Sequence, residues 1–229
     1  MATNRLKHLF FDLDDTLWDF EGNSSNVMRL LFNNYQLEYH LNTSFETFFE
    51  NYKQINAGLW QQYSAKLISK EYLRNHRFEL SFNTLNYSNY EMGLAFSEDY
   101  ISHSPQGKLL KPNSLEVLMY LKEKYALHVI TNGFKEVQTI KLNNCNLTPF
   151  FDQIIISEDY QTNKPDRKLF EIAQQLTNAN PEECLMIGDN FENDVLGAIS
   201  AGWRAVWYTP IQHRDYQTVS DLIELKGLL

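Results

Sequence analysis

Short apolar runs alternate with amphipathic segments through most of the chain. The apolar runs lie at residues 9–13, 128–131, 153–156, 185–187 and 205–208, and amphipathic segments cover 114–124, 134–143, 167–176 and 192–201. The first kind is typical of buried strands and the second of helices that pack on a sheet. The alternation predicts the α/β class, with a Rossmann-like doubly wound parallel sheet and a ligand site beyond the carboxyl ends of its strands.

The stretch from residue 20 to residue 104 has a different pattern. Apolar residues recur every three or four positions in 27–35 and 45–59, and all six prolines of the chain lie at or after Pro105. Thr43, Ser69 and Ser88 are candidate helix N-caps. We therefore expect about four helices here, and a chain divided into an α/β core (1–19 and 105–229) and an inserted all-helical domain (20–104).

Charge and composition narrow the possible partners. The 229 residues carry 29 acidic and 20 basic side chains, for a formal charge of −9. Because this balance offers no basic stripe for a phosphate backbone, we expect no polymeric nucleic acid as partner. With only Cys145 and Cys184, no apolar run of about 18 residues and no signal pattern in residues 1–8, we expect a cytoplasmic protein without membrane contact.

Two aspartates end the first predicted strand. Asp12 and Asp14 stand two residues apart, so they share one side of an extended backbone. Two adjacent carboxylates need a cation or different protonation states, as a nucleophile and a general acid have. Taken alone, however, the pattern also fits a solvated acidic turn.

Three later segments place further polar groups at strand ends. Thr131 and Asn132 end the second strand and open a helix, Lys164 precedes another helix, and Asp189 and Asp194 follow the fourth strand. Each has an ordinary alternative, as a helix cap, a surface lysine or an acidic first turn. Together they would converge on one edge of the sheet, where backbone N–H groups and a lysine can bind an anion.

In this order, the segments DxDxT, Thr-Asn-Gly, Lys-Pro and Gly-Asp-x4-Asp resemble the motifs of the haloacid dehalogenase superfamily of phosphohydrolases. The resemblance covers Leu6–Thr16 and about 105–229, and it makes the insert a type 1 helical cap. It implies that Asp12 is the nucleophile that forms an aspartyl-phosphate and that Asp14 is the general acid and base. It also implies Mg²⁺ held by Asp12, the Asp14 backbone carbonyl and Asp189.

The same resemblance implies roles for the remaining motif residues. Thr131, Asn132 and Lys164 would bind phosphoryl oxygens. Asp194 would orient a water or Lys164, and Thr16 would shape the loop after the first strand. An ester oxygen needs an acid to leave whereas a halide does not, so an aspartate at position 14 disfavours 2-haloacid dehalogenase chemistry.

Two segments of the insert, 55–63 and 73–79, resemble the cap of pyrimidine 5′-nucleotidases. This implies a small phosphorylated substrate, a pyrimidine nucleoside 5′-monophosphate such as dUMP, dTMP, UMP or a modified-base analogue. Trp60 or Phe78 would then stack on the base, and Asn56 or Arg77 would bind it, although aromatic residues at helical spacing also build cores.

Other functions stay open from the sequence. They are a sugar-phosphate or phosphoglycolate phosphatase, a phosphomutase of the same fold, and a catalytically idle binding module. Lys66-Leu67 stands where the nucleotidase resemblance leads us to expect a glycine-containing turn. We expect a monomer or a weak homodimer.

Overall fold

The computed structural model describes residues 6–229. Met1–Arg5 lie outside the described residues, and part of the expectation about a signal sequence falls on them. The chain divides into two compact units, one made of the residues up to Phe20 together with Lys108–Leu229, the other of Glu21–Gly107. The insert therefore ends at Gly107, whereas the sequence pattern placed its end at residue 104.

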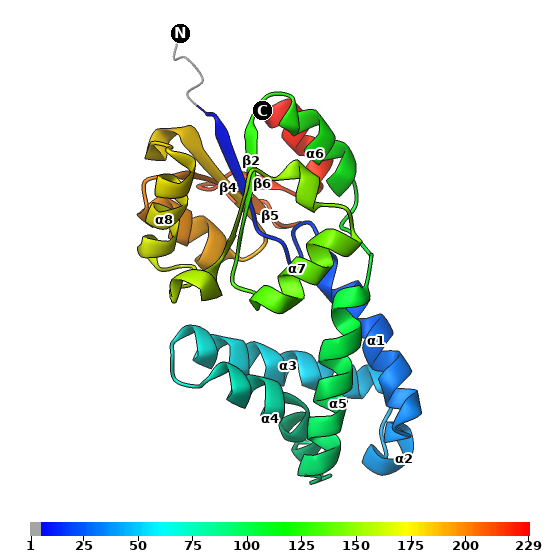
Figure 1. Cartoon of the computed structure of the whole chain (residues 1–229). Helices are drawn as coiled ribbons and strands as arrows, with labels where there is room; N and C mark the ends of the chain where they lie inside the picture. The colour runs from blue at the N-terminus through cyan, green and yellow to red at the C-terminus, as the bar shows by residue number, and fades with distance from the viewer. Residues whose placement is uncertain (1–5) are drawn as a thin grey trace. The chain divides into compact units, whose positions relative to one another are not determined.

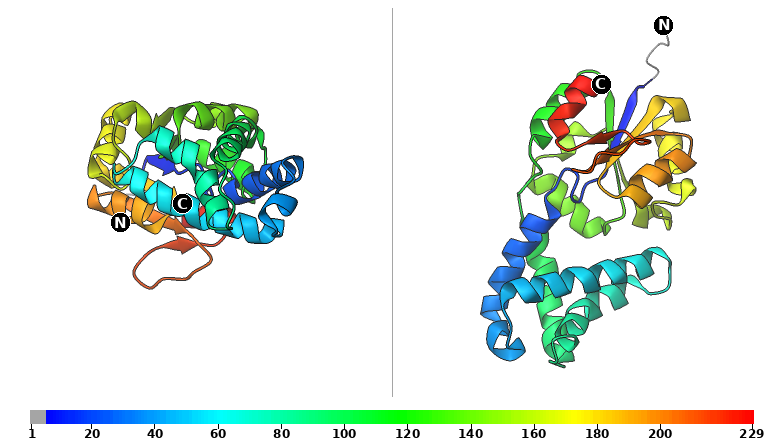
Figure 2. Two further views of the ribbon diagram at one scale, coloured as in Figure 1. Left: turned by 90° about the horizontal axis from the view of Figure 1, so that it is seen from below. Right: turned by 180° about the vertical axis from the view of Figure 1, so that it is seen from behind.

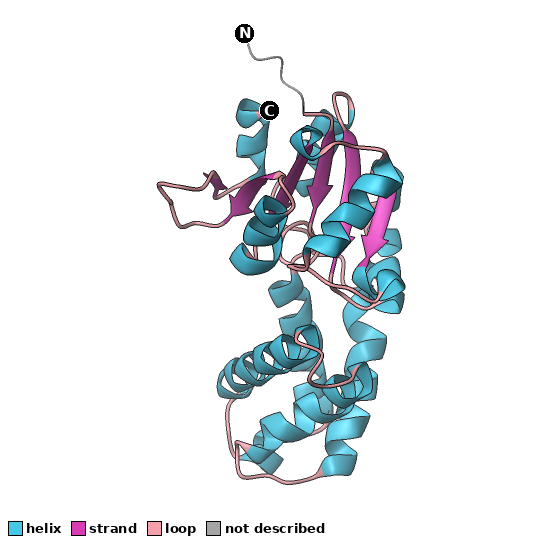
Figure 3. Ribbon diagram, turned by 90° about the vertical axis from the view of Figure 1, so that its left-hand side faces the viewer, coloured by secondary structure: helices cyan, strands magenta, loops and turns pink. Residues whose placement is uncertain are grey.

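The first unit, which we call the core unit, contains a parallel sheet. Within residues 6–229 its strands are β1 (His8–Phe11), β2 (Ala126–Thr131), β3 (Gln153–Ile156), β4 (Cys184–Gly188), β5 (Arg204–Tyr208) and β6 (Thr218–Val219), in the order β3-β2-β1-β4-β5-β6. The doubly wound sheet predicted from the alternation is confirmed, with β6 as an additional edge strand (Figure 3). β1 lies between β2 and β4, where the strand order reverses, so its carboxyl end is the expected position of a ligand site.

Helices cover both faces of this sheet (Figure 1). Alternate residues of β1 point to opposite faces, and their contacts show which helices pack on each face. Leu9 and Phe11 pack in one cluster with α6 (Ser114–Lys122) and Leu142 of α7 (Lys135–Asn144). Phe10 points to the other cluster, with α8 (Arg167–Thr177) and α9 (Gly197–Ser200). A short α10 (Leu225–Leu228) packs near α6. The helix expected over 192–201 is a π-helical segment, Phe191–Leu196, followed by α9.

The second unit, which we call the cap unit, is entirely helical. Its fully described chain forms α1 (Phe20–Asn34, which begins one residue before the unit), α2 (Leu37–Leu41), α3 (Phe45–Ser64), α4 (Lys70–Asn83) and α5 (Tyr90–His103). The three side chains that cap α3, α4 and α5 are Ser44, Ser69 and Asn89. Ser69 was the predicted cap, but at the other two helices the predicted Thr43 and Ser88 are wrong by one residue.

Aromatic rings fill the interior of the cap unit, which explains the aromatic surplus of this segment. Phe48, Phe78 and Phe96 are each 0% exposed, and the Phe78 ring stacks on Tyr52 at 5.0 Å between centroids. α1 and α5 lie side by side (Figure 2), joined by a 2.7 Å hydrogen bond between the hydroxyls of Ser24 and Tyr100. In the part of the chain that is described, no helix combines the length and the apolar character needed to cross a membrane.

Candidate active site

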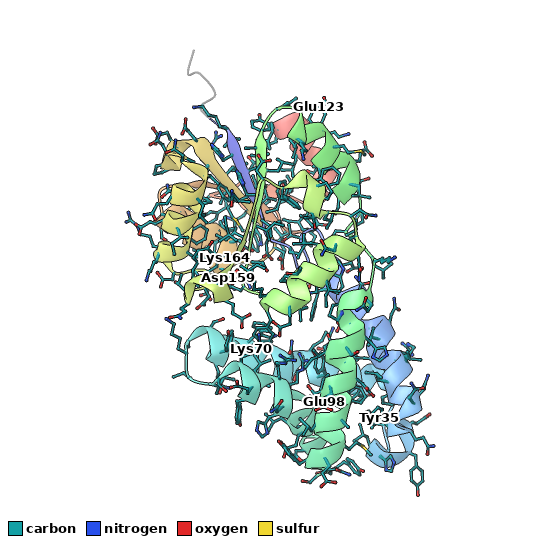
Figure 4. The ribbon with its side chains drawn as sticks, viewed as in Figure 1. Tyr35, Lys70, Glu98, Glu123, Asp159 and Lys164 are labelled. Atoms are coloured by element: carbon teal, nitrogen blue, oxygen red, sulfur yellow. The ribbon has the colours of Figure 1, made fainter. Side chains whose placement is uncertain are left out.

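The polar residues singled out in the core unit meet at the carboxyl edge of its sheet. Asp12 directly follows β1, and its backbone N–H donates to the carbonyl of Ile187 in β4 at 2.9 Å, which continues the pairing of the two strands. Asp189 directly follows β4, and Thr131 ends β2. Lys164 lies on the side of the sheet toward which the strands end (Figure 4). The parallel arrangement thus gathers residues from four distant parts of the chain.

Lys164 is buried between two carboxylates. Its Nζ is 2.7 Å from Asp12 Oδ1 and 2.6 Å from Asp194 Oδ1, and the residue is only 2% exposed. Burial lowers the pKa of this ammonium, but the two carboxylates outweigh burial and raise the pKa above its ordinary value. Lys164 is therefore a fixed positive charge at the position of the candidate nucleophile.

Asp12 is itself almost fully buried, and burial raises the pKa of its carboxyl well above the ordinary value. Lys164 counters this rise, whereas Asp194 and Asp189 add to it. A further cation next to Asp12 would favour the ionised carboxylate that a nucleophile needs.

Asp194 binds Lys164, and each of its two carboxylate oxygens accepts a hydrogen bond. Oδ1 accepts from Lys164, and Oδ2 accepts from the backbone N–H of Asn190 at 3.0 Å. A Cβ on Gly188 would overlap the Asp194 carboxylate, so only glycine fits at the end of β4. This geometry favours a positioning role for Asp194 over direct contact with a substrate.

Asp189 belongs to the same cluster of carboxylates as Asp12 and Asp194, and Thr16 holds it in place. The Thr16 hydroxyl donates to Asp189 Oδ1 and accepts from the Asp189 backbone N–H, both at 3.0 Å. Trp207 Nε1 donates to the Asp189 carbonyl at 2.8 Å. Burial, followed by the charge of Asp194, raises the pKa of the Asp189 carboxyl to about 7, and a nearby cation would favour its ionised form.

The acidic cluster fits a small divalent cation. One carboxylate oxygen from each of Asp12, Asp189 and Asp194 lies within 4.8 Å of the others, near the roughly 4.2 Å that separates opposite oxygens around magnesium. Three carboxylates and the single ammonium of Lys164 leave two negative charges when all are ionised. Since Asp194 already binds Lys164 and Asn190, Asp12 and Asp189 are the better side-chain ligands.

Asp14 is held by helix α7 rather than by the acidic cluster. Its Oδ1 is 2.6 Å from Lys141 Nζ, and its Oδ2 accepts from Gln138 Nε2 at 2.9 Å. The carboxylate keeps 29% of its surface exposed, whereas Lys141 and Gln138 are buried. Asp14 is thus the candidate acid or base that solvent and a leaving group can reach.

The segment after β2 supplies two different polar groups. The Thr131 hydroxyl accepts from the Gly133 N–H at 3.1 Å and from Gln138 Nε2 at 2.8 Å, which leaves its own proton to donate to a ligand. The Asn132 side chain donates to the Lys164 carbonyl and accepts from the Lys164 N–H, both at 2.8 Å. Because both ends of this amide are occupied, Asn132 positions Lys164, and only its backbone N–H remains for a phosphate.

The four residues predicted to contact the base of the substrate lie in the cap unit, and they differ in how far they are exposed to solvent. They are Asn56, Trp60, Arg77 and Phe78. Trp60 is half-buried, and Phe78 is enclosed by Tyr52, Phe96 and Tyr100. That packing makes Phe78 part of the cap interior, with no free face for a base. Arg77 is 6% and Asn56 8% exposed, and Arg77 Nε and Asn56 Oδ1 have no hydrogen-bond partner among residues 6–229.

Sequence reasoning missed three residues that contact the site residues: Gln138, Lys141 and Trp207. Gln138 and Lys141 are one turn apart on α7 and occupy buried positions where an amphipathic helix ordinarily carries apolar side chains. Polar residues on the predicted buried face of this helix were therefore the sequence feature that could have indicated a contact with the site. Trp207 gave none, because an aromatic residue in a strand is ordinary.

The parallel sheet with its helical insert places the protein in the α/β class, and the acidic cluster around the buried Lys164 gives the carboxyl edge of that sheet groups that can bind a cation and an anion. The family model described as haloacid dehalogenase-like hydrolase matches residues 6–202. The chain belongs to this family, as the order of its motifs indicated.

Named relatives cover nearly the whole chain. It is 31% identical to pyrimidine 5′-nucleotidase YjjG of Escherichia coli, over 96% of both proteins. It is 32% identical to pyrimidine 5′-nucleotidase PynA of Streptococcus pneumoniae, over 97% of this chain and 93% of that protein. Among solved structures, the magnesium-bound HAD-hydrolase YfnB of Bacillus subtilis superposes with a TM-score of 0.88, at 27% identity and 98% coverage of each chain.

Proposed function

We propose that this protein is a magnesium-dependent phosphoric monoester hydrolase that acts through an aspartyl-phosphate on Asp12. The observation that carries the proposal is the pairing of a buried carboxylate, Asp12, with the buried ammonium of Lys164 at 2.7 Å, next to the more accessible Asp14. A carboxylate nucleophile, a fixed positive charge for phosphoryl oxygens and a separate acid are the groups that this reaction needs.

In the first step, an oxygen of Asp12 attacks phosphorus while the bond from phosphorus to the ester oxygen breaks, and Asp14 donates a proton to that leaving oxygen. In the second step, Asp14 accepts a proton from water, the water oxygen attacks phosphorus, and the bond to Asp12 breaks to release phosphate. Lys164 and the Thr131 hydroxyl bind the oxygens of the phosphoryl group in both steps. Magnesium, held by Asp12, Asp189 and the Asp14 carbonyl, would neutralise charge on these oxygens.

We propose pyrimidine nucleoside 5′-monophosphates as the substrate class. Support comes from the two nucleotidases, each more than 30% identical over nearly the full chain, and from two groups of the cap unit. Arg77 Nε is a buried donor and Asn56 Oδ1 a buried acceptor, and neither atom has a hydrogen-bond partner within the described chain. A uracil or thymine edge offers the complement, a carbonyl beside an N–H.

Phosphate release from a panel of monoesters, with magnesium or with EDTA, tests this proposal. The panel contains dUMP, dTMP, UMP, dCMP, dAMP, a hexose phosphate and phosphoglycolate. We expect dUMP and dTMP to turn over fastest, and EDTA to abolish release. Faster turnover of the sugar phosphate or phosphoglycolate would refute the nucleotidase proposal but leave the phosphatase intact.

The nucleophile is tested by Asp12→Asn, which keeps the size of the side chain. We expect the loss of phosphate release on every substrate, with the exposed Asp215→Asn as a matched control that keeps it. Activity retained in Asp12→Asn would remove Asp12 from the mechanism.

Base reading is tested by Arg77→Met. We expect a higher KM for dUMP and an unchanged kcat/KM for 4-nitrophenyl phosphate, which has no base. The aryl substrate reports whether the variant remains folded, because its turnover needs an intact core unit.

A further inference from the structure

Gln138 and Lys141 hold both oxygens of Asp14 from one face of α7. Lys141 Nζ is 2.6 Å from Asp14 Oδ1, and Gln138 Nε2 is 2.9 Å from Asp14 Oδ2. The same Gln138 amide donates to the Thr131 hydroxyl at 2.8 Å. The candidate acid and the candidate phosphate ligand are therefore joined through one side chain.

Lys141 is fixed by its surroundings. It is 3% exposed, and its Nζ lies 4.2 Å from the centroid of the Trp18 ring and 5.6 Å from that of Phe20. A cation over an aromatic face is attracted to it, which restricts where this ammonium can move. The lysine thus gives Asp14 a rigid partner rather than a mobile surface one.

Fold stability does not explain this arrangement. Gln138 Oε1 is buried without a hydrogen-bond partner in residues 6–229, a defect that ordinarily costs about 1–3 kcal/mol. A buried ammonium is likewise weak support for stability, since an apolar side chain of the same size packs as well. A Cβ at position 133 would overlap the Gln138 amide, so the observed position of that amide requires glycine at residue 133.

We propose that Lys141 and Gln138 are positioning residues that fix the Asp14 carboxylate at the place where it exchanges protons with the leaving oxygen and with water. This inference rests on the proposed acid and base role of Asp14. Neither residue touches the substrate. Their effect is geometric, and a shift of about 1 Å in a catalytic group lowers a rate by roughly 100-fold.

The test compares two substrates that differ in their need for an acid. The leaving alkoxide of dUMP needs a proton, whereas 4-nitrophenolate leaves without one. For Lys141→Met we expect kcat on dUMP to fall by about 100-fold with little change in KM. On 4-nitrophenyl phosphate we expect a rapid burst of one nitrophenolate per protein, followed by slow turnover, because only hydrolysis of the aspartyl-phosphate still needs Asp14.

Three variants make the result specific. Gln138→Met releases the other oxygen of Asp14 and should show the same burst with a smaller loss on dUMP. Lys141→Arg retains a cation and should recover part of the activity. Lys135→Met removes an exposed lysine of the same helix, paired with Asp159, and should behave as the unmodified protein.

Asp14→Asn separates this inference from the proposed function. If Asp14→Asn gives the burst and Lys141→Met does not, Asp14 is the acid and base and the positioning inference is wrong. If Asp14→Asn keeps full turnover of dUMP, the assignment of Asp14 itself fails. Faster turnover of dUMP by Lys141→Met would show that α7 holds Asp14 away from its working position, which also overturns the inference.

Discussion

Replacing Lys164 by methionine tests the electrostatic account of the site through stability rather than activity. The substitution keeps an unbranched aliphatic stem but removes the ammonium that lies 2.7 Å from Asp12 and 2.6 Å from Asp194. Both carboxylates are buried, at 9% and 0% exposure, so neither is freed to solvent. Breaking a buried pair by removing one partner destabilises a protein by about 3–5 kcal/mol, and we expect this loss at pH 7.5 without magnesium.

The pH dependence gives the sharper test. Without Lys164, the pKa of Asp12 in the folded protein rises further above its value in the unfolded chain, so the folded state binds more protons. The contribution of Asp12 to the stability of the variant must then increase as the pH falls toward about 4. The difference in free energy of unfolding between Lys164→Met and the unmodified protein should therefore be smaller at pH 5 than at pH 7.5.

Urea unfolding with EDTA present, followed by tryptophan fluorescence, measures both quantities. The double variant Lys164→Met with Asp194→Asn should be more stable than Lys164→Met alone, because one uncompensated charge is gone. Lys135→Met, whose lysine is exposed, is the control and should change stability by no more than the measurement error. A loss below about 1 kcal/mol at pH 7.5, or a difference that grows toward pH 5, would refute the reasoning.

Two further predictions concern other parts of the core unit. Gly133→Ala should displace the Gln138 amide, and we expect a loss of dUMP turnover of about tenfold or more in a phosphate-release assay, with Ser220→Ala as an exposed control; full activity would contradict the contact. Burial, followed by the charge of His8, lowers the pKa of His128 to about 4, so the unfolded chain gains a proton first as the pH falls below 6.5. Stability should therefore fall between pH 6.5 and 4, by up to about 3 kcal/mol from this group, and His128→Phe, compared by urea unfolding, should remove that part of the slope; an unchanged slope would exclude the histidine.

The site residues at the strand ends were predictable because, in a parallel sheet, the position of a residue relative to its strand fixes the edge of the sheet at which it lies. Alternating segments predicted a parallel sheet, and in such a sheet residues that follow different strands meet at one edge. This rule was sufficient to predict that Asp12, Thr131 and Asp189 lie close together. Lys164 follows β3 only after a loop, and it reaches Asp12 because the Asn132 side chain clamps its backbone.

The contacts of α7 were not predictable in the same way. A helical period fixes which face is buried, but it does not tell which buried polar residue contacts which partner. Lys141 fits a helix in which snorkelling lysines are common, and its burial against Trp18 emerges only from the packing of distant segments. The predicted N-caps of α3 and α5 were wrong by one residue because two adjacent residues can cap each helix. These pairs are Thr43-Ser44 and Ser88-Asn89.

Each catalytic carboxylate of the proposed mechanism has its own ammonium. Lys164 contacts Asp12, and Lys141 contacts Asp14; the first pair is buried, whereas in the second the carboxylate keeps 29% of its surface exposed. An overall charge of −9 disfavours extended polyanions, but it says nothing about this local balance. Asp12, Asp14, Asp189 and Asp194 with two lysines leave two negative charges, which one divalent cation neutralises. A small phosphate ester then meets the ammonium of Lys164 near the attacked phosphorus, while Lys141 balances the charge of Asp14, so the site can bind an anion within an acidic protein.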